Sequence, residues 1–360
     1  MLIYVCSSSH GFGHAARDAA VLQALHQRRP EWRLVFSSKL PPAVLQLLIG
    51  IPSIEIRSLQ WDVGMVQADA LGSNPEGTIE ALEDLEQWLP NQVLAEVCWI
   101  REQGEKVVIL ADIPPSAAEL AAQLRCPLVW LGNFGWDAIY APFGGRLQEQ
   151  AQKAEQAYRR GDLLLRCPFD LPMDWGLPEV RLGLVTSPPR PLPLQLRQEL
   201  QCIDHPLVMV GFGGLGLPVE PTHFQGWPDH HFLMPPPGNT SPPLHLQALP
   251  NLTLLPAGVR PLDLLPLCSR HLGKPGFSTF CEVMAAGVGL HVVERQDFAE
   301  GSALMKGLRD HAASLTLSRS AYLQGDWRLD RPLEKAQKGC LPANGAAVAA
   351  SAIVSLADQT

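Results

Sequence analysis

Residues 2–18 read LIYVCSSSHGFGHAARD: an apolar run, a loop with two glycines and two histidines, and then an alanine-rich stretch. An uninterrupted apolar run is typical of a parallel strand that is buried on both faces. Gly11 and Gly13 allow a ligand to approach the backbone closely, and the N-terminus of the helix after them favours an anion. Ligands of open α/β sheets bind at the carboxyl ends of strands, so this segment predicts a ligand-binding strand–loop–helix unit.

The same alternation of apolar runs and helical stretches continues along the chain, which predicts βαβ units and doubly wound parallel sheets. Between its two halves, residues 187–193 (SPPRPLP) can continue neither a helix nor a central strand, so they predict a linker. We therefore predict an α/β protein of two Rossmann-like domains, residues 1–187 and 194–360, and we expect the last helix to pack back on the first domain. The expected strands are 2–6, 33–37, 107–111, 128–131, 206–211, 231–234, 252–255, 270–272 and 290–293, and the expected helices are 15–27, 43–48, 116–124, 261–268, 282–286 and about 346–356.

Composition supports a globular chain in a reducing compartment. With 360 residues, 46% hydrophobic and 18% charged, the chain can bury two cores. Its net charge of -8 argues against a non-specific nucleic-acid binder. The eight cysteines form no C-x-x-C pair and predict reduced thiols. No signal peptide or membrane span is recognisable, so we predict a cytoplasmic protein. Residues 42–51 (PAVLQLLIGI) predict a helix on a sheet, with peripheral membrane contact as the alternative.

The first glycine loop lacks the third glycine of a dinucleotide fingerprint, so NAD binding is poorly supported. His14 falls in the first turn of the helix, where its imidazole can act as a general base on a hydroxyl or donate to a phosphate oxygen. The alternative is a histidine that bonds only to local backbone. We predict that Gly11, Gly13 and Arg17 line the ligand site beside His14.

A second glycine loop, residues 211–216 (GFGGLG), follows the expected strand 206–211. The backbone N–H groups of Gly213 and Gly214 can form a nest for an anion. An ordinary glycine turn is the alternative, since such turns often follow strands.

The third motif is the strongest: residues 273–282, GKPGFSTFCE. Thr279 and Glu282 have the spacing of a capping box at a helix start. A diphosphate would suit this helix start. It could bind to the free N–H groups, to the hydroxyls of Ser278 and Thr279 and to the charge of Lys274, and Gly276 allows it to approach closely. Glu282 then either accepts hydrogen bonds from ribose hydroxyls or bonds back to the Thr279 N–H as a plain cap.

Polar residues also follow two of the expected strands. Asp112 ends one strand and is expected to face the ligand as a second candidate base, while the aromatic residues of 133–137 (NFGWD) can stack on a sugar ring. Capping of a turn is the alternative for both segments. Residues 229–231 (DHH) predict no metal site, because His230 and His231 point to opposite faces of a strand. No D-x-D pair, P-loop or G-x-S-x-G elbow occurs, so no metal is expected.

Five segments resemble the glycosyltransferase-like region at the N-terminus of plant and bacterial L-arabinokinases. The third motif also looks like the donor-binding segment of the wider superfamily that includes the peptidoglycan transferase MurG and the plant UDP-glycosyltransferases. The segments are HGFGHAARD (10–18), DVGMVQADAL (62–71), ADIPPSAAELA (111–121), NFGWDAIY (133–140) and GKPGFSTFCEVMAAG (273–287).

The resemblance implies a GT-B fold, with two domains facing a central cleft and a nucleotide-sugar held mainly by the second. It implies that Ser278, Thr279 and Glu282 contact phosphate and ribose, that residues from Asp297 to Glu300 meet donor sugar hydroxyls, and that His14 serves as base. Two departures stand out. Gln296 and Asp297 reverse the Asp-Gln order of plant transferases, and no galactokinase-type domain follows, so arabinose phosphorylation is not expected.

Three hypotheses follow. The first is an inverting, metal-independent glycosyltransferase. Its co-substrate is a nucleotide-sugar donor, expected to be a UDP-sugar, and no other cofactor is expected. Its acceptor is a small molecule or a glycan. The second is a nucleotide-sugar 2-epimerase on the same fold. The third is a non-catalytic nucleotide-sugar-binding protein.

Overall fold

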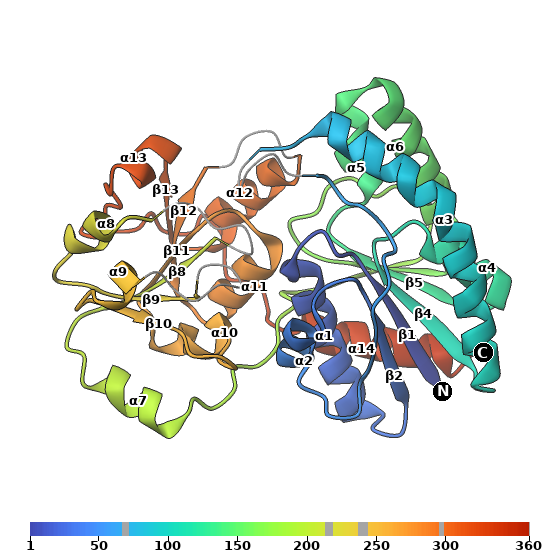
Figure 1. Ribbon diagram of the computed structural model, residues 1–360, viewed down its shortest axis with the longest axis horizontal. Coiled ribbons are helices and arrows are strands. Elements are labelled where there is room, and N and C mark those ends of the chain that lie inside the picture. Colours follow the sequence, from blue (N-terminus) through green and yellow to red (C-terminus); the bar gives the residue numbers. More distant parts are fainter. Residues whose placement is uncertain (67–71, 213–218, 237–243, 295–298, 360) are drawn as a thin grey trace.

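Two parallel sheets make up the molecule, and the computed structural model describes residues 1–66, 72–212, 219–236, 244–294 and 299–359. The first sheet has seven strands in the order β3-β2-β1-β4-β5-β6-β7, and the second has six in the order β10-β9-β8-β11-β12-β13. All strand pairs are parallel, and each order reverses once, as in a doubly wound sheet. Figure 1 shows the two domains side by side, so the predicted fold class is confirmed.

The first domain alternates strands and helices, and it includes three strands and three α-helices that the sequence did not predict. Its strands are β1 (Leu2–Ser7), β2 (Arg33–Ser37), β3 (Glu55–Arg57), β4 (Val107–Asp112), β5 (Leu128–Gly132), β6 (Leu163–Arg166) and β7 (Glu179–Arg181). Its helices are α1 (Phe12–Arg28), α2 (Pro42–Ile49), α3 (Pro75–Glu102), α4 (Ala117–Leu124), α5 (Trp136–Tyr140), the 3-10 helix η1 (Ala141–Phe143) and α6 (Gly145–Tyr158).

The second domain repeats the plan. Its strands are β8 (Leu207–Gly211), β9 (His231–Met234), β10 (Leu252–Leu254), β11 (Arg270–Gly273), β12 (Gly289–Val293) and β13 (Ser314–Leu317). Its helices are α7 (Leu194–Gln201), α8 (Pro221–Gln225), α9 (Leu244–Gln247), α10 (Pro261–Leu264), η2 (Leu265–Leu267), α11 (Phe277–Ala285), α12 (Glu300–His311) and α13 (Arg319–Leu323), and α14 (Gly345–Ala357) ends the chain.

Alternating side chains of β1 supply two separate cores. Ile3 and Val5 pack with α1, α2 and α14, whereas Leu2 and Tyr4 pack with α3, α4 and α6. The first of these apolar clusters continues without a break into the second domain, where it includes Phe277 of α11. The two domains therefore share an apolar contact, as well as a linker.

The last helix lies against the first domain rather than the second. α14 packs beside α1 (Figure 1), the N–H of Gly345 donates to the Leu184 carbonyl, and Arg29 pairs with Asp358 at 3.1 Å. This is the arrangement that we expected for the last helix. No helix in the described part of the chain combines the length and apolar character that crossing a membrane requires.

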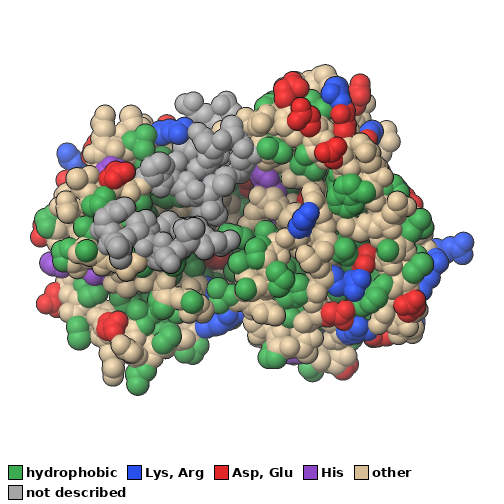
Figure 2. Space-filling view, viewed as in Figure 1, with side chains coloured by type: hydrophobic (Ala, Val, Ile, Leu, Met, Phe, Trp, Pro, Cys, Tyr) green, Lys and Arg blue, Asp and Glu red, His purple; other side chains and the backbone are tan. Residues whose placement is uncertain are grey.

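On the face of the molecule shown in Figure 2, acidic and basic side chains of the described residues are interspersed among apolar and uncharged ones. Most surface ion pairs are made by half-exposed groups, for example Lys153 with Glu86 on neighbouring helices. Such pairs contribute little to stability. The informative charges are instead the buried ones at the carboxyl ends of β1 and β4.

Candidate active site

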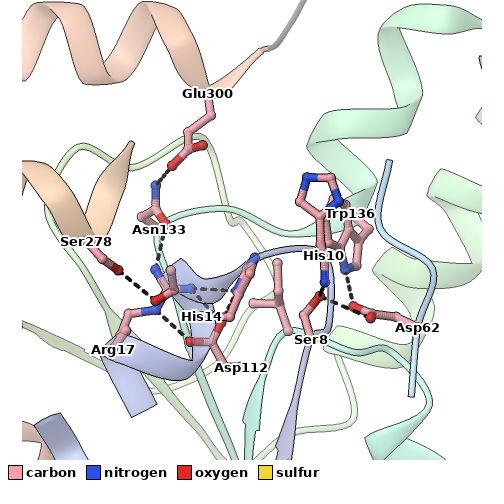
Figure 3. A network of polar contacts seen from close by, with 12 residues as sticks. Ser8, His10, His14, Arg17, Asp62, Asp112, Asn133, Trp136, Ser278 and Glu300 are labelled. Atoms are coloured by element: carbon pink, nitrogen blue, oxygen red, sulfur yellow. Dashed lines mark hydrogen bonds and ion pairs between the residues drawn. The ribbon is translucent and has the colours of Figure 1, made fainter. Parts of the chain in front are cut away.

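A buried ionic cluster lies at the carboxyl ends of β1 and β4. The strand register pairs Ser7 with Asp112, so Asp112 ends its strand directly beside the loop that leads into α1. His14 and Arg17, one turn apart on α1, both point toward it. His14 Nδ1 lies 2.7 Å from Asp112 Oδ1, and Arg17 Nε donates to Asp112 Oδ2 at 2.7 Å (Figure 3). The structure thus brings together His14, Arg17 and Asp112, all three of which were predicted site residues.

Asp112 is fully buried and remains an anion because of its partners. Burial alone would raise the pKa of this carboxyl group, but the charges and hydrogen bonds of Arg17 and His14 outweigh it, and its pKa is lowered. An ionised carboxylate only accepts hydrogen bonds, so His14 Nδ1 carries a proton and Nε2 is left as an acceptor. The imidazole is therefore held in the tautomer that a general base needs.

A second carboxyl group lies beneath this cluster. Asp18 is fully buried one turn after His14, and neither of its side-chain oxygens has a hydrogen-bond partner among the described residues. Burial raises the pKa of Asp18 well above its ordinary value, and the charge of Asp112 raises it further. Burial and the charge of Asp112 therefore both disfavour a second negative charge at this position.

Aromatic rings surround His14. The ring centroids of Phe134 and Trp136 lie 6.1 and 6.3 Å from it, and His10 lies edge-on to Trp136 at 5.3 Å. Trp136 is itself buried, stacks on Tyr140, and donates from Nε1 to Asp62 at 2.8 Å. The prediction that the aromatic residues of 133–137 stack on a sugar is thus not supported for Trp136, because its ring is enclosed by protein.

Two side-chain hydrogen bonds cross from the first domain to the second at this site. Arg17 Nη1 donates to Asn133 Oδ1 at 2.7 Å, and Asn133 Nδ2 in turn donates to Glu300 Oε1 at 2.8 Å. Separately, Ser278 Oγ donates to the Gly13 carbonyl at 2.7 Å (Figure 3). The glycine loop of the first domain therefore faces the N-terminus of α11.

The start of α11 differs from the prediction. The helix begins at Phe277, with Gly276 as its N-cap residue, and no side chain caps it. Thr279 is then the third residue of the helix, so the capping-box reading of Thr279 and Glu282 is wrong. The backbone N–H groups of the first turn have no acceptor within the helix, which makes this terminus suited to an anion, and Lys274 lies just before it.

Glu282 is therefore not used as a cap. Burial raises its pKa to about 7, with Arg260 opposing the rise and Asp263 adding to it. A carboxyl group with this pKa changes charge near neutral pH. Glu282 lies on α11 about one turn after these N–H groups, and its contact with a ribose stays a prediction.

Three predicted ligand residues, Gly213, Gly214 and Asp297, lie outside the described residues. Gly11 is an extended residue that ends the loop before α1, and a side-chain carbon at Gly13 would meet Ser278 Oγ at 3.5 Å. Asp62 is a polar residue of this region to which the sequence analysis gave no role. It accepts from Ser8 Oγ and Trp136 Nε1, and burial raises its pKa.

The two histidines of residues 229–231 lie in different surroundings. His231 turns to Thr253 Oγ1 at 2.8 Å, whereas His230 lines an open cavity of about 840 Å³ that shares no residue with the His14 cluster. Among the described residues, no three His, Cys, Asp or Glu side chains gather as they would around a metal ion.

Comparison with known proteins places this geometry in context. No family model matches the chain. It is 27% identical over 337 residues to L-arabinokinase of Arabidopsis thaliana, a match that covers 89% of this chain and 31% of that protein. The chain thus spans about a third of the length of this relative.

Solved structures resemble the whole chain. UGT89C1 of Arabidopsis thaliana superimposes with a TM-score of 0.64 over 99% of both chains at 12% identity, and SnogD of Streptomyces nogalater, a glycosyltransferase, with 0.54 over 99% of both at 18%. UGT89C1 in complex with quercetin gives a TM-score of 0.61 at 14% identity, over 98% of this chain and 92% of that one. The chain has the GT-B fold, and its structural neighbours are glycosyltransferases.

Proposed function

We propose that the protein is an inverting, metal-independent glycosyltransferase that moves a sugar from a UDP-sugar to an acceptor hydroxyl. The observation that carries the proposal is the placement of the His14–Asp112 pair opposite the free N-terminus of α11. A proton acceptor and an anion-binding helix terminus then lie on the two sides of one site. UGT89C1 has been solved in complex with UDP and with UDP-L-rhamnose, which supports UDP as the nucleotide.

In the proposed reaction, His14 Nε2 takes the proton of the acceptor hydroxyl while that oxygen attacks the anomeric carbon. The new C–O bond forms as the bond from that carbon to the diphosphate oxygen breaks, and UDP leaves with the electron pair. Asp112 stabilises the imidazolium through the Nδ1 hydrogen bond. A single displacement of this kind inverts the anomeric centre.

The second domain stabilises the leaving group in this mechanism. The N–H groups at residues 277–279 and the Lys274 ammonium compensate charge on the diphosphate, and Glu282 accepts from the ribose. Ser278 Oγ already donates to the Gly13 carbonyl, so in the described conformation its hydroxyl is left as an acceptor. The proposal assigns no metal ion to the diphosphate, which the helix terminus and Lys274 hold instead.

The test is a thermal-shift screen with UDP and a panel of UDP-, GDP- and dTDP-sugars, followed by turnover assays. A true donor should stabilise the chain by about 2.7 kcal/mol at a hundredfold excess over its Kd. His14→Ala should lower kcat by about a hundredfold to ten-thousandfold and leave UDP affinity within about threefold. His205→Ala, a change at an exposed histidine of the second domain, is the matched control.

The outcomes separate the three hypotheses. A transferase needs an acceptor, whereas an epimerase converts the donor alone. A binding protein responds in the thermal screen and turns nothing over. A chain that responds to no nucleotide or nucleotide-sugar contradicts all three.

A further inference from the structure

A continuous chain of polar contacts leads from the proposed base into the second domain. It runs from His14 through Asp112, Arg17 and Asn133 to Glu300. Each residue lies within hydrogen-bond distance of the next, as the dashed lines in Figure 3 show. Asn133 and Asp112 are fully buried, Arg17 is 2% exposed and Glu300 is 8% exposed. These polar contacts are thus shielded from water, so each of them is stronger than it would be at the surface.

Asn133 is the only member whose two polar groups face different domains. It follows β5, and its Oδ1 accepts from Arg17 while its Nδ2 donates to Glu300, the first residue of α12. The amide cannot be reversed, because its NH2 group would then face the Arg17 guanidinium, which only donates. The link therefore has a fixed direction.

Arg17 receives a second contact from the second domain. Its guanidinium lies over the ring of Phe277, the first residue of α11, at 4.7 Å from the ring centroid. The start of α11 therefore contacts Arg17 directly, whereas the start of α12 is linked to Arg17 only through Asn133. If the domains separate, Arg17 loses Phe277, Asn133 loses Glu300, and only first-domain contacts hold Asp112 and His14.

We propose that Asn133 is a positioning residue that latches the two domains together and holds the His14–Asp112–Arg17 cluster in its working geometry only when they are closed. The role of the cluster rests on the proposed function, whereas the latch itself does not. Glu300, predicted to meet donor sugar hydroxyls, acts in this proposal as the partner of Asn133.

The test is a charge-swap cycle of Asn133→Asp, Glu300→Gln and the double variant. Asn133→Asp places a carboxylate against Glu300, which should repel it and open the latch. The double variant restores a hydrogen bond in the opposite direction, from the Gln amide to the Asp carboxylate, and it keeps an acceptor for Arg17. Asn91→Asp, the same charge change at an exposed site on α3, is the control.

Two readouts are needed. Spin labels on the exposed Cys98 and Cys202, one in each domain, report the distance between the domains. The exposed Cys340 is changed to Ser so that it carries no label. Steady-state assays with the donor found in the thermal screen report kcat and KM. Asn133→Asp should lengthen or broaden the distance distribution and lower kcat about tenfold to a hundredfold, with UDP affinity within about threefold of wild type.

The double variant should recover both the distance distribution and at least about tenfold of the lost kcat. Equal loss in Asn133→Asp and in the double variant overturns the proposal, as does a fall in kcat with no change in the distance. A wild-type chain that turns over no nucleotide-sugar contradicts the proposed function, and the distance measurement still decides the latch.

Discussion

At the scale of single residues, the buried Asp112 and the partly buried Glu282 have opposite electrostatic surroundings. Asp112 faces Arg17 and His14, and its pKa is lowered. Glu282 shares the charge of Arg260 with Asp263, and burial raises its pKa to about 7. Asp112 is thus a permanent anion that orients a base, whereas Glu282 changes charge within the physiological range.

The raised pKa of Glu282 predicts a specific dependence of stability on pH. Because the folded pKa of about 7 exceeds the ordinary value of 4.5, the contribution of this group to the free energy of unfolding is fully present below 4.5 and is lost as pH rises through 7. The Glu282→Gln variant should not lose stability in this way, because its side chain does not ionise. Urea titrations at pH 4.5 and 8 should show the variant gaining on the order of 2 kcal/mol relative to wild type at the higher pH. A difference that does not change with pH would contradict the shift.

The Asp112–Arg17 pair predicts a large cost of removing one partner. Asp112→Asn leaves the Arg17 guanidinium buried without its counter-charge, which should lower the free energy of unfolding by about 3–5 kcal/mol. The control is Asp326→Asn, which breaks the exposed pair with Arg328 and should cost less than about 1 kcal/mol. Both can be measured by urea unfolding at pH 7, and equal losses would show that the buried pair is not specially stabilising.

At the scale of elements, nine of the thirteen described strands were predicted, because short apolar runs mark parallel strands buried on both faces, whereas β3, β6, β7 and β13 were not. β2 and β9 have the predicted bounds, and β4 and β5 each extend one residue further. The helix α3, 28 residues long, was not predicted, since Pro90 in its middle and its many charged residues obscure the helical period. The short helix α11 was placed too late because Thr279 imitates a cap, although the helix begins at Phe277 with Gly276 as its N-cap residue.

The same physics explains which part of the site was predictable. His14, Arg17 and Asp112 come together because the carboxyl ends of adjacent parallel strands and the following helix share one edge of a sheet. The bond between Asn133 and Glu300 joins residues 167 positions apart in two domains, and no local pattern encodes it. Asp and Asn at the ends of β4 and β5 were the available signal, but turn capping explained them equally well.

The helix α14 gives a prediction for an element that joins the end of the chain to the first domain. Ile353 is fully buried in the apolar cluster beside α1, so Ile353→Ala should cost about 2–5 kcal/mol through lost contacts and the cavity left behind. Ser355→Ala, at an exposed position of the same helix, should change stability by less than about 0.5 kcal/mol. Thermal and urea unfolding measure both, and a negligible loss in Ile353→Ala would mean that α14 is dispensable for the fold.

At the scale of the whole molecule, the orientation of the domains depends on a shared apolar cluster, on the contacts around Arg17 and on the linker. Arg190, in the linker, donates from Nη1 to the Leu47 carbonyl at 2.7 Å and from Nη2 to the Leu48 carbonyl at 3.1 Å, both at the end of α2. Its backbone N–H donates to Asp263 Oδ1 in the second domain at 2.8 Å. One residue thus joins the two domains on the side away from the latch.

Arg190→Ala should therefore loosen the linker without touching the proposed chemistry. The side chain satisfies two carbonyl groups at the C-terminus of a helix, and its loss should release the linker from α2 while each domain stays folded. We expect a broader Cys98–Cys202 distance distribution, a fall of about tenfold in kcat/KM and an unchanged UDP affinity. Arg181→Ala, at an exposed residue of β7, is the control. An unchanged distribution would show that the apolar cluster alone fixes the domains, and a fall in UDP affinity would show that the linker supports the donor site itself.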